Sequence, residues 1–343
     1  MESTVSVIIP TYNRADLVGR AIRSALSECI PGDEVIVADD GSTDNTSAVL
    51  RQFGDAVKVL RLANGGAGKA RNAGISSAKS EFVAFLDSDD EWRPGKLRLQ
   101  RTFLQARPDV VFCFSDFSNR NRDGQITRNF LRFWHNDPRS WDEILGPQVP
   151  YASIVGPTNS ADFNVHIGDL SLPEMQSAYV FTSSMIARRS AGDSLRFAED
   201  VGTFEDLECF GRLALSGKAA YFDCETVWQH GHSGPRLTGA STLVKATSRL
   251  TILERVWGTN EAFLARHRRE FETAIDETRK LRIRALLNAG ESGEAKVELG
   301  KLFGTAPMPD RIASALPQWL LRAGLKLSGK RVTESATTRF PSL

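Results

Sequence analysis

The 343-residue sequence lacks paired cysteines, a long hydrophobic run and an excess of charge of either sign. Its four cysteines are scattered without a CxxC pair, which excludes a disulfide framework and a cysteine zinc site. No apolar run reaches the ~18 to 20 residues that a membrane-spanning helix needs. The 43 basic residues almost balance the 42 acidic ones, so we expect no nucleic acid as a partner. The N-terminus has neither the basic nor the apolar region of a signal peptide, and we expect a cytoplasmic protein.

Two nucleotide-binding motifs are also absent. A P-loop would need GxxxxGK[ST], but Ala63 stands at its first glycine position and Ala70 at its hydroxyl position. A Rossmann fingerprint would directly follow the first predicted strand, where Pro10-Thr11-Tyr12 stand instead. What remains is a glycine-rich turn before a helix, with Lys69 and Arg71 nearby. This turn fits a diphosphate site and simple helix packing equally well.

Buried-strand patterns alternate with amphipathic helices along the first hundred residues. Short apolar runs predict strands at residues 5–10, 35–38, 57–60 and 82–86, with helical spacing between them. This alternation predicts an α/β protein with a doubly wound, mostly parallel sheet. Beyond Ser241 the pattern is helical with repeated breaks, which predicts a C-terminal helical extension.

Polar clusters follow three of the predicted strands: Thr11-Tyr12-Asn13, Asp39-Asp40 and Asp87-Ser88-Asp89. Taken alone, the last cluster fits a solvated acidic turn as well as it fits a divalent cation site. If the strand pleat continues past Leu86, Asp87 and Asp89 point to the same side. Because ligands of parallel sheets bind beyond the carboxyl ends of the strands, three clusters at one edge favour a binding site.

These segments carry a family resemblance. Residues 5–14, 37–44, 68–72 and 85–90 closely resemble, in this order, the nucleotide-sugar-binding half of the family 2 glycosyltransferases. Thr182-Ser183-Ser184, Phe204-Glu205-Asp206 and the histidines after Trp228 look like the acceptor half of that family. The resemblance covers about residues 5–235 and implies a Rossmann-like glycosyltransferase A fold.

The resemblance also implies three regions. Residues 1–116 would be the nucleotide-sugar-binding half of one α/β domain, and residues 117–238 its acceptor-binding half. Residues 239–343 would form the helical region. The reaction implied is an inverting transfer of a sugar from a nucleoside diphosphate, with a UDP-sugar expected, to the hydroxyl of a glycan or lipid-linked acceptor. It would serve cell-surface polysaccharide or glycoconjugate synthesis.

Each polar cluster receives a role from the resemblance. The residues implied in donor binding are Pro10, Thr11, Tyr12, Asp39, Asp40, Gly68, Arg71, Asp87 and Ser88, with Asp40 against the uracil. Asp89 would be the direct ligand of Mn²⁺ or Mg²⁺, with Asp87 towards ribose and metal. His230 or His232 would contact the metal or the diphosphate.

Asp206, next to Glu205, would be the general base of the implied reaction. Considered alone, Asp206 also fits a negative charge favoured at a helix N-terminus. Considered alone, the two histidines fit ordinary hydrogen-bonded residues. Two other readings of the whole chain stay open: a non-catalytic sugar-nucleotide or carbohydrate-binding protein, and a nucleotidyltransferase on a related fold.

Two stretches outside these motifs are harder to interpret. Residues 118–175 show no regular period and predict a loop-rich lid or insertion. Their aromatic residues, Phe130, Phe133, Trp134 and Trp141, fit a sugar-stacking wall, although a small satellite core is the commoner explanation. Residues 311–343 hold six basic residues against one acidic residue, mixed with Trp319 and several leucines. This tail fits a peripheral contact at the inner face of the membrane, or a helix packed on the body.

Overall fold

The computed structural model describes residues 3–135, 137–157, 163–232, 239–305 and 307–316. The chain divides into two compact units. The sheet unit comprises Met1–Glu199, Glu205–Gly234 and Pro341–Leu343, and the helical unit comprises Asp200–Phe204 and Pro235–Phe340. The basic tail predicted to contact a membrane lies mostly in residues 317–343, outside the described residues.

The described part of the sheet unit is built on one eleven-stranded sheet. Its strands are β1 (Val5–Thr11), β2 (Glu34–Asp39), β3 (Lys58–Arg61), β4 (Phe82–Phe85), β5 (Asp90–Trp92), β6 (Val110–Arg120), β7 (Ile126–Thr127), β8 (Gln148–Pro150), β9 (Asn164–Gly168), β10 (Ile186–Arg188) and β11 (Lys218–His230). The main path is β3-β2-β1-β4-β10-β6-β11-β9-β8, while β5 pairs with β11 and β7 with β6.

The sheet is mixed, as its register shows. The strands β3, β2, β1 and β4 run parallel to one another, and β6 runs parallel to β11. The strand β10 is inserted antiparallel between β4 and β6, and β9 runs antiparallel to β11. The predicted mostly parallel α/β sheet is confirmed, with this antiparallel insertion added.

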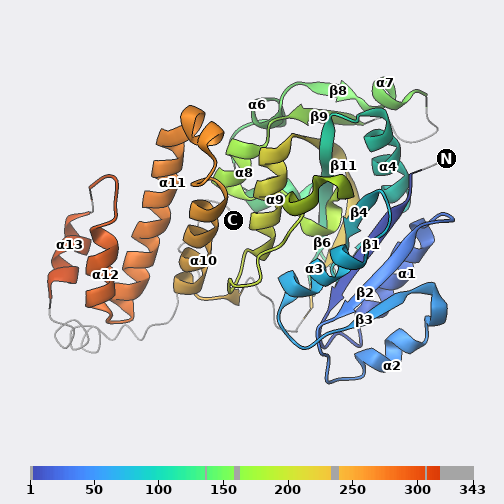
Figure 1. The fold of residues 1–343 in the computed structure, drawn as a ribbon, viewed down its shortest axis with the longest axis horizontal. Coiled ribbons are helices and arrows are strands. Elements are labelled where there is room, and N and C mark those ends of the chain that lie inside the picture. The colour runs from blue at the N-terminus through green and yellow to red at the C-terminus, as the bar shows by residue number, and fades with distance from the viewer. Residues whose placement is uncertain (1–2, 136, 158–162, 233–238, 306, 317–343) are drawn as a thin grey trace. The chain divides into compact units, whose positions relative to one another are not determined.

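Helices cover both faces of the sheet (Figure 1). They are α1 (Val18–Glu28), α2 (Thr46–Arg51), α3 (Ala67–Ser77), α4 (Lys96–Ala106), α5 (Phe130–His135), α6 (Trp141–Leu145), α7 (Tyr151–Val155), α8 (Ser171–Ser177) and α9 (Glu205–Ser216). The chain steps from β1 to β2 in one direction and from β3 to β4 in the other, so right-handed crossovers place α1 and α3 on opposite faces. The helix α9 packs against α3, and α4 packs against α1.

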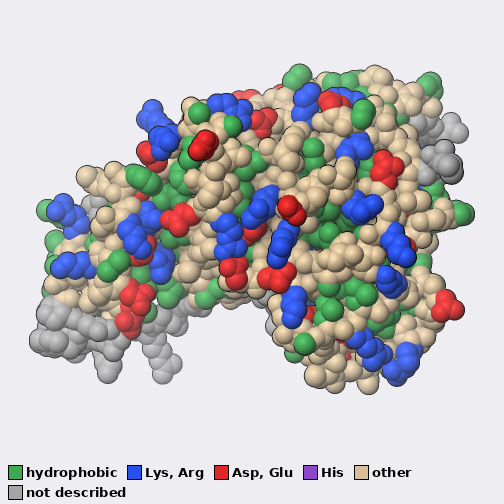
Figure 2. Space-filling model, in the orientation of Figure 1, with side chains coloured by type: hydrophobic (Ala, Val, Ile, Leu, Met, Phe, Trp, Pro, Cys, Tyr) green, Lys and Arg blue, Asp and Glu red, His purple; other side chains and the backbone are tan. Residues whose placement is uncertain are grey.

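The core follows from the strand patterns. All seven residues of β1 and all four of β4 are buried, because helices cover both faces of these central strands. The face drawn in Figure 2 carries basic and acidic side chains interspersed with apolar and neutral ones, in keeping with the balanced composition.

Residues 118–175 are more regular than their sequence predicts. They hold β7, β8, β9 and the helices α5 to α8, and β8 with β9 extends the sheet. These elements span only two to seven residues, too few to show a period in the sequence. Phe130, Trp134 and Trp141 pack against the main core, where the sequence predicts a small satellite core, whereas Phe133 is 66% exposed.

Two strands in the second half of the sheet unit have irregular surroundings. A 3₁₀ turn over Thr182–Ser184 leads into β10. The strand β11 runs without a break over Lys218–His230, because shifts in register on either side of Glu225 absorb the irregularity.

The helical unit comprises α10 (Thr242–Val256), α11 (Glu261–Asn288), α12 (Ser292–Leu299) and α13 (Met308–Ala315). Each helix packs on the next, and Asn260 caps α11 by accepting a hydrogen bond from the Phe263 N–H at 2.8 Å. The C-terminal helical extension is confirmed. A search of the described residues finds no helix long and apolar enough to cross a membrane.

Candidate active site

Polar side chains gather at one edge of the sheet unit because three parallel strands end there. Thr11 at the end of β1 pairs in register with Asp39 at the end of β2, and the Asp40 N–H donates to the Thr11 carbonyl at 2.9 Å. The acidic segment that begins at Asp87 directly follows β4, the other neighbour of β1. The predicted clustering at this edge is therefore present.

The glycine-rich loop is held by Asp40. The Gly65 and Gly66 N–H groups donate to the two Asp40 carboxylate oxygens at 2.9 and 2.7 Å, and the Asn64 amide donates at 3.2 Å. Gly66 has φ of 92°, a conformation that favours glycine. A Cβ on Gly68 would lie 2.0 Å from the Ala198 carbonyl oxygen, so Gly68 permits close packing. These contacts favour the packing interpretation of the loop.

The remaining residues predicted to bind the donor line the same edge. Pro10, Thr11, Asp39 and Ser88 are buried, and Asp39 accepts a hydrogen bond from the Ser42 N–H at 3.0 Å. The Tyr12 side chain is 45% exposed, which leaves its ring accessible to a ligand.

The acidic segment is a turn and not a continued strand. β4 ends at Phe85, and the Asp90 N–H donates to the Asp87 carbonyl at 3.0 Å. The expectation that pleating aligns Asp87 with Asp89 was therefore wrong. Ser183 fastens the turn, because its hydroxyl accepts from the Asp87 N–H at 3.1 Å and donates to the Asp90 carboxylate at 2.5 Å.

Both predicted histidines reach the acidic segment. His232 Nε2 lies 2.7 Å from Asp89 Oδ2, and His230 Nε2 lies 3.0 Å from Glu91 Oε2. Burial, together with the nearby Arg20, lowers the pKa of His230, while Glu91 opposes the shift. The structure thus places His232 against the residue predicted to be the metal ligand.

Gly231, between the two histidines, lets this segment approach β6 closely. A Cβ at this position would lie 2.8 Å from the backbone nitrogen of Arg122. The Gly231 N–H donates to the Arg120 carbonyl at 2.7 Å, and the Arg122 guanidinium donates to the His232 carbonyl at 2.6 Å. The backbone that carries both histidines is therefore held by residues 120–122.

Arg71 joins the acidic turn to the helix α9. Its guanidinium donates to Asp87 at 2.7 Å and to Glu205 at 2.8 Å, and it lies 5.0 Å from the centre of the Phe197 ring. Burial lowers the pKa of Arg71, but the two carboxylates more than offset this effect and hold the pKa above its ordinary value. Burial raises the pKa of Asp87, and Arg71 opposes that shift.

Asp206 lies in the first turn of α9, where it accepts hydrogen bonds from the Leu207 N–H at 2.9 Å and the Thr182 hydroxyl at 3.3 Å. Burial, followed by the charge of Glu205, raises the pKa of Asp206 to about 7, although Arg71 opposes the shift. A carboxylate with a pKa near neutrality suits proton acceptance at physiological pH. The Thr182–Ser184 turn thus contacts both Asp206 and the acidic turn.

The side-chain oxygen and nitrogen atoms of this site fit a metal ion that is coordinated partly by the protein and partly by the substrate. Among the described residues, no group of three or more His, Cys, Asp or Glu side chains is arranged to hold a metal. Asp89 and His232 provide an adjacent carboxylate and imidazole, both suitable for Mn²⁺. Mg²⁺ commonly takes one or two carboxylates and completes its shell with substrate phosphates and water.

Two site residues were missed by sequence reasoning. The Arg20 guanidinium on α1 donates to the Asp89 carbonyl at 2.6 Å, and Gly231 permits the close approach described above. Neither carries a signal in the sequence, since Arg20 reads as one exposed charge on an amphipathic helix. Ser183 belongs to the Thr182-Ser183-Ser184 motif, but the motif does not predict its contacts with Asp87 and Asp90.

Comparisons with known proteins place this edge in context. Residues 6–153 match the profile described as Glycosyl transferase family 2. A relative in Bacillus subtilis, "Putative teichuronic acid biosynthesis glycosyltransferase TuaG", is 38% identical over 131 residues, which cover 37% of this chain and 52% of the relative. An uncharacterized glycosyltransferase of Nostoc is 46% identical over 112 residues, or 31% of this chain and 34% of the relative. The chain therefore matches about half or less of the length of these relatives.

Solved structures match nearly the whole chain. TarS 1–349 of S. aureus in complex with UDP-GlcNAc aligns with a TM-score of 0.59 at 19% identity, covering 93% of this chain and 87% of TarS 1–349. The mannosyltransferase PcManGT of Pyrobaculum calidifontis, in complex with GDP-Man and Mn²⁺, aligns with a TM-score of 0.51 at 17% identity, covering 96% and 88%. At these identities the likeness establishes a shared fold.

Proposed function

The chain belongs to glycosyl transferase family 2 through residues 6–153, and on this premise we propose that it moves a sugar from a nucleoside diphosphate to an acceptor hydroxyl with inversion. Its fold is of the glycosyltransferase A type. We assign the donor to residues 1–116 and the acceptor to residues 117–238, most of which belong to the sheet unit.

One observation carries the proposal: Arg71 pairs with both Asp87, in the predicted donor turn, and Glu205, next to the predicted base. This arrangement brings Asp206 near the donor turn although Asp206 and Ser88 stand 118 positions apart in the sequence (206 − 88). The pKa of about 7 leaves the Asp206 carboxylate able to accept a proton near neutral pH.

Asp89, His232 and Asp206 have different roles in the proposed reaction. Asp89 and His232 are suited to hold a divalent cation, which when bound would neutralise charge on the departing diphosphate. Asp206 accepts the proton of the acceptor hydroxyl as its oxygen attacks the anomeric carbon. The bond from that carbon to the diphosphate oxygen breaks on the opposite side, so the configuration inverts. General base assistance of this kind contributes roughly 10² to 10⁴-fold.

The donor and the pathway rest on the relatives. TarS binds UDP-GlcNAc, and the Bacillus subtilis relative is named for teichuronic acid biosynthesis. We therefore propose a UDP-sugar as donor, Mn²⁺ or Mg²⁺ as cofactor, and a glycan or lipid-linked acceptor in cell-surface polysaccharide synthesis. We place the reaction at the inner face of the cytoplasmic membrane, where a lipid-linked acceptor would be accessible.

A panel of nucleotide sugars tests the proposal. We expect one UDP-sugar to raise the thermal unfolding midpoint in the presence of Mn²⁺, and to release UDP when a suitable acceptor is added. Asp89→Ala should lose the Mn²⁺-dependent part of the protection. Asp193→Ala is the matched control, because Asp193 is exposed on the sheet unit.

Two results would contradict the proposal. If no nucleotide sugar of the panel raised the thermal unfolding midpoint in the presence of metal, the proposed donor binding would be contradicted. Release of pyrophosphate from a nucleoside triphosphate and a sugar phosphate would instead identify a nucleotidyltransferase.

A further inference from the structure

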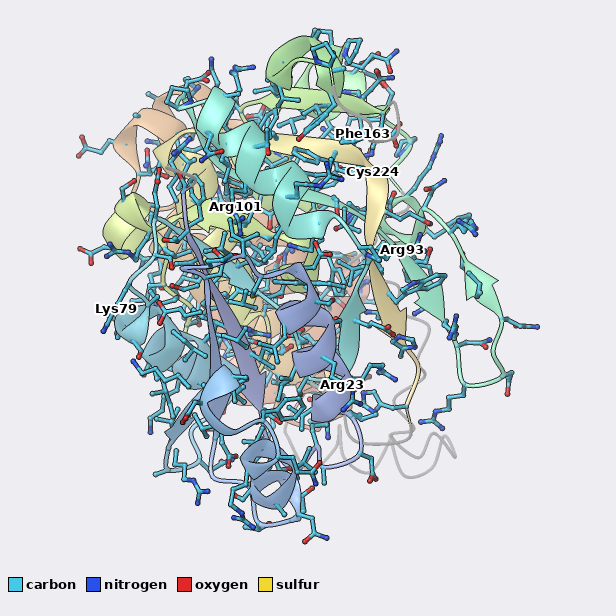
Figure 3. The ribbon with its side chains drawn as sticks, turned by 90° about the vertical axis from the view of Figure 1, so that its right-hand side faces the viewer. Arg23, Lys79, Arg93, Arg101, Phe163 and Cys224 are labelled. Atoms are coloured by element: carbon cyan, nitrogen blue, oxygen red, sulfur yellow. The ribbon has the colours of Figure 1, made fainter. Side chains whose placement is uncertain are left out.

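Trp228 lies between two arginines at the end of β11. The guanidinium carbon of Arg93 is 3.9 Å from the centre of the Trp228 ring, and that of Arg120 is 5.0 Å away. Arg120 is exposed, whereas Arg93 and Trp228 are partly buried. We call Arg93, Arg120 and Trp228 the Trp228 platform. Figure 3 shows Arg93 beside the long strand β11.

The platform adjoins the predicted metal and diphosphate contacts. Trp228 and His230 are two residues apart in β11, and no register shift occurs after Val227, so their side chains point to the same face. Trp228 also pairs in register with Glu91, whose carboxylate contacts His230 at 3.0 Å. The Trp228 platform is therefore adjacent, along β11, to the contact between His230 and Glu91.

Two of the local arginines already have partners. Arg93 pairs with Glu225 at 3.0 Å and donates to the Ser118 hydroxyl at 2.7 Å. Arg128 also approaches Glu225, at 3.4 Å. These contacts fix Arg93 and make it a support for the Trp228 ring, not a free cation.

Arg120 differs from its neighbours. Within the described residues, no carboxylate forms an ion pair with its guanidinium, which rests on the Trp228 ring. An arginine held over an aromatic ring without an ion-pair partner keeps N–H groups for a carboxylate or a phosphate.

Four arginines gather at this end of β11 although the chain as a whole is nearly neutral. Arg20 contacts Glu91, Arg93 and Arg128 contact Glu225, and Arg120 lies over the Trp228 ring. Over the whole sequence the formal net charge is only +1. A concentration of arginine beside a site attracts an anionic ligand and orients it.

We propose that the Trp228 platform is an acceptor subsite for an acidic glycan, with Arg120 binding a carboxylate or phosphate near the hydroxyl that receives the sugar. This inference rests on the proposed function and specifies its acceptor class. Trp228 positions the Arg120 guanidinium, and the Arg93–Glu225 pair positions Trp228.

Binding of charge-matched glycans to the full-length chain tests the platform. The probes are a hexasaccharide of alternating glucuronate and N-acetylglucosamine, its carboxyl-reduced counterpart, and a polyol oligomer joined by phosphodiesters. We expect calorimetric titration to show at least about tenfold tighter binding of an acidic probe than of the neutral one. The stronger of the two acidic probes identifies carboxylate or phosphate as the recognised group.

Single substitutions then locate the binding. Arg120→Gln should weaken binding of the preferred acidic probe about tenfold and leave the neutral probe unchanged. Arg120→Lys should restore part of the loss, because it keeps the charge but not the flat fork of donors. Arg23→Gln is the matched control, since Arg23 is exposed on α1 and its guanidinium lies beside Gly19 of the same helix.

Three outcomes would overturn the proposal. Equal binding of acidic and neutral probes would show that charge is not recognised. Unchanged binding of the acidic probe by Arg120→Gln would show that the Trp228 platform is not the binding site. Arg120-dependent binding in a chain that shows no metal-dependent protection by any nucleotide sugar would remove the acceptor role. Because donor protection is measured without an acceptor, failure of the subsite and failure of the proposed function give different results.

Discussion

Replacing Asp206 with asparagine should stabilise the protein at neutral pH and abolish sugar transfer. The substitution keeps the shape of the side chain and its ability to accept the Leu207 N–H, and it removes only the ionisable group. In the wild type, burial and Glu205 raise the pKa of Asp206 from the ordinary 3.8 to about 7. The ionised carboxylate is therefore less stable in the folded protein than in the unfolded chain.

The sign and size of the effect follow from proton linkage. The folded protein binds the Asp206 proton more tightly than the unfolded chain does, so stability falls as pH rises from about 4 to about 7 and then levels off. At ~1.36 kcal/mol for each pKa unit, this loss is at most about 4 kcal/mol. Water reaching the partly exposed side chain reduces the loss. Asp206→Asn should lack this pH dependence.

Urea unfolding of both proteins at pH 4.5, 6 and 8 measures the effect. We expect similar midpoints at pH 4.5 and a higher midpoint for Asp206→Asn at pH 8, with Asp193→Asn as the exposed control. Wild-type transfer should decline about tenfold per pH unit below pH 7, as the base becomes protonated. A variant less stable than wild type at pH 8, or one that still transfers sugar at the wild-type rate, would refute the reasoning.

Three further substitutions have defined outcomes. Arg71→Met leaves two carboxylates without their buried counterion. Measured by urea unfolding, it should lower the free energy of unfolding by about 3–5 kcal/mol at pH 8 and by less at pH 5. An equal loss at both pH values would contradict this prediction. Gly231→Ala places a Cβ 2.8 Å from the Arg122 backbone nitrogen, and should weaken Mn²⁺-dependent donor protection several-fold in thermal shift assays; unchanged protection would show that the histidine segment tolerates displacement. Lys96→Met removes a fully buried amine whose pKa burial lowers to about 7. Between pH 7 and about 10 the unfolded chain binds this proton and the folded protein does not, so wild-type stability rises with pH. The urea midpoint of Lys96→Met should exceed that of wild type at pH 7, and the excess should shrink towards pH 10; a constant difference would exclude titration of Lys96.

The sequence predicts the central strands because they are buried on both faces. The apolar runs at residues 5–10 and 82–86 predict the buried strands β1 and β4. Because these strands are parallel, the polar residues that follow them lie at one edge of the sheet. The strand β10, by contrast, is three residues long and enters the sheet antiparallel from far along the chain. No local pattern specifies which neighbours such a short strand takes.

The members of the site were easier to predict than their contacts. Asp87, Arg71 and Glu205 were each named from motifs, but the ion pairs that join them depend on residues 16 and 134 positions apart. Asp87 and Asp89 were expected to align by strand pleating, which the turn closing at Asp90 prevents. Pairing of distant side chains depends on tertiary packing, which the hydrophobic periodicity of the sequence does not specify.

The double pairing of Arg71 also limits how this protein can be recombined with its relatives. An exchange of everything after residue 116 would keep Arg71 and Asp87 but replace Glu205, together with the Thr182–Ser184 turn that contacts both Asp206 and the acidic turn. A chimaera would then hold a buried guanidinium with one carboxylate in place of two, unless the incoming half supplied an equivalent acid. Successful exchange of acceptor specificity should therefore retain Glu205 and residues 182–184 from the same parent as α3.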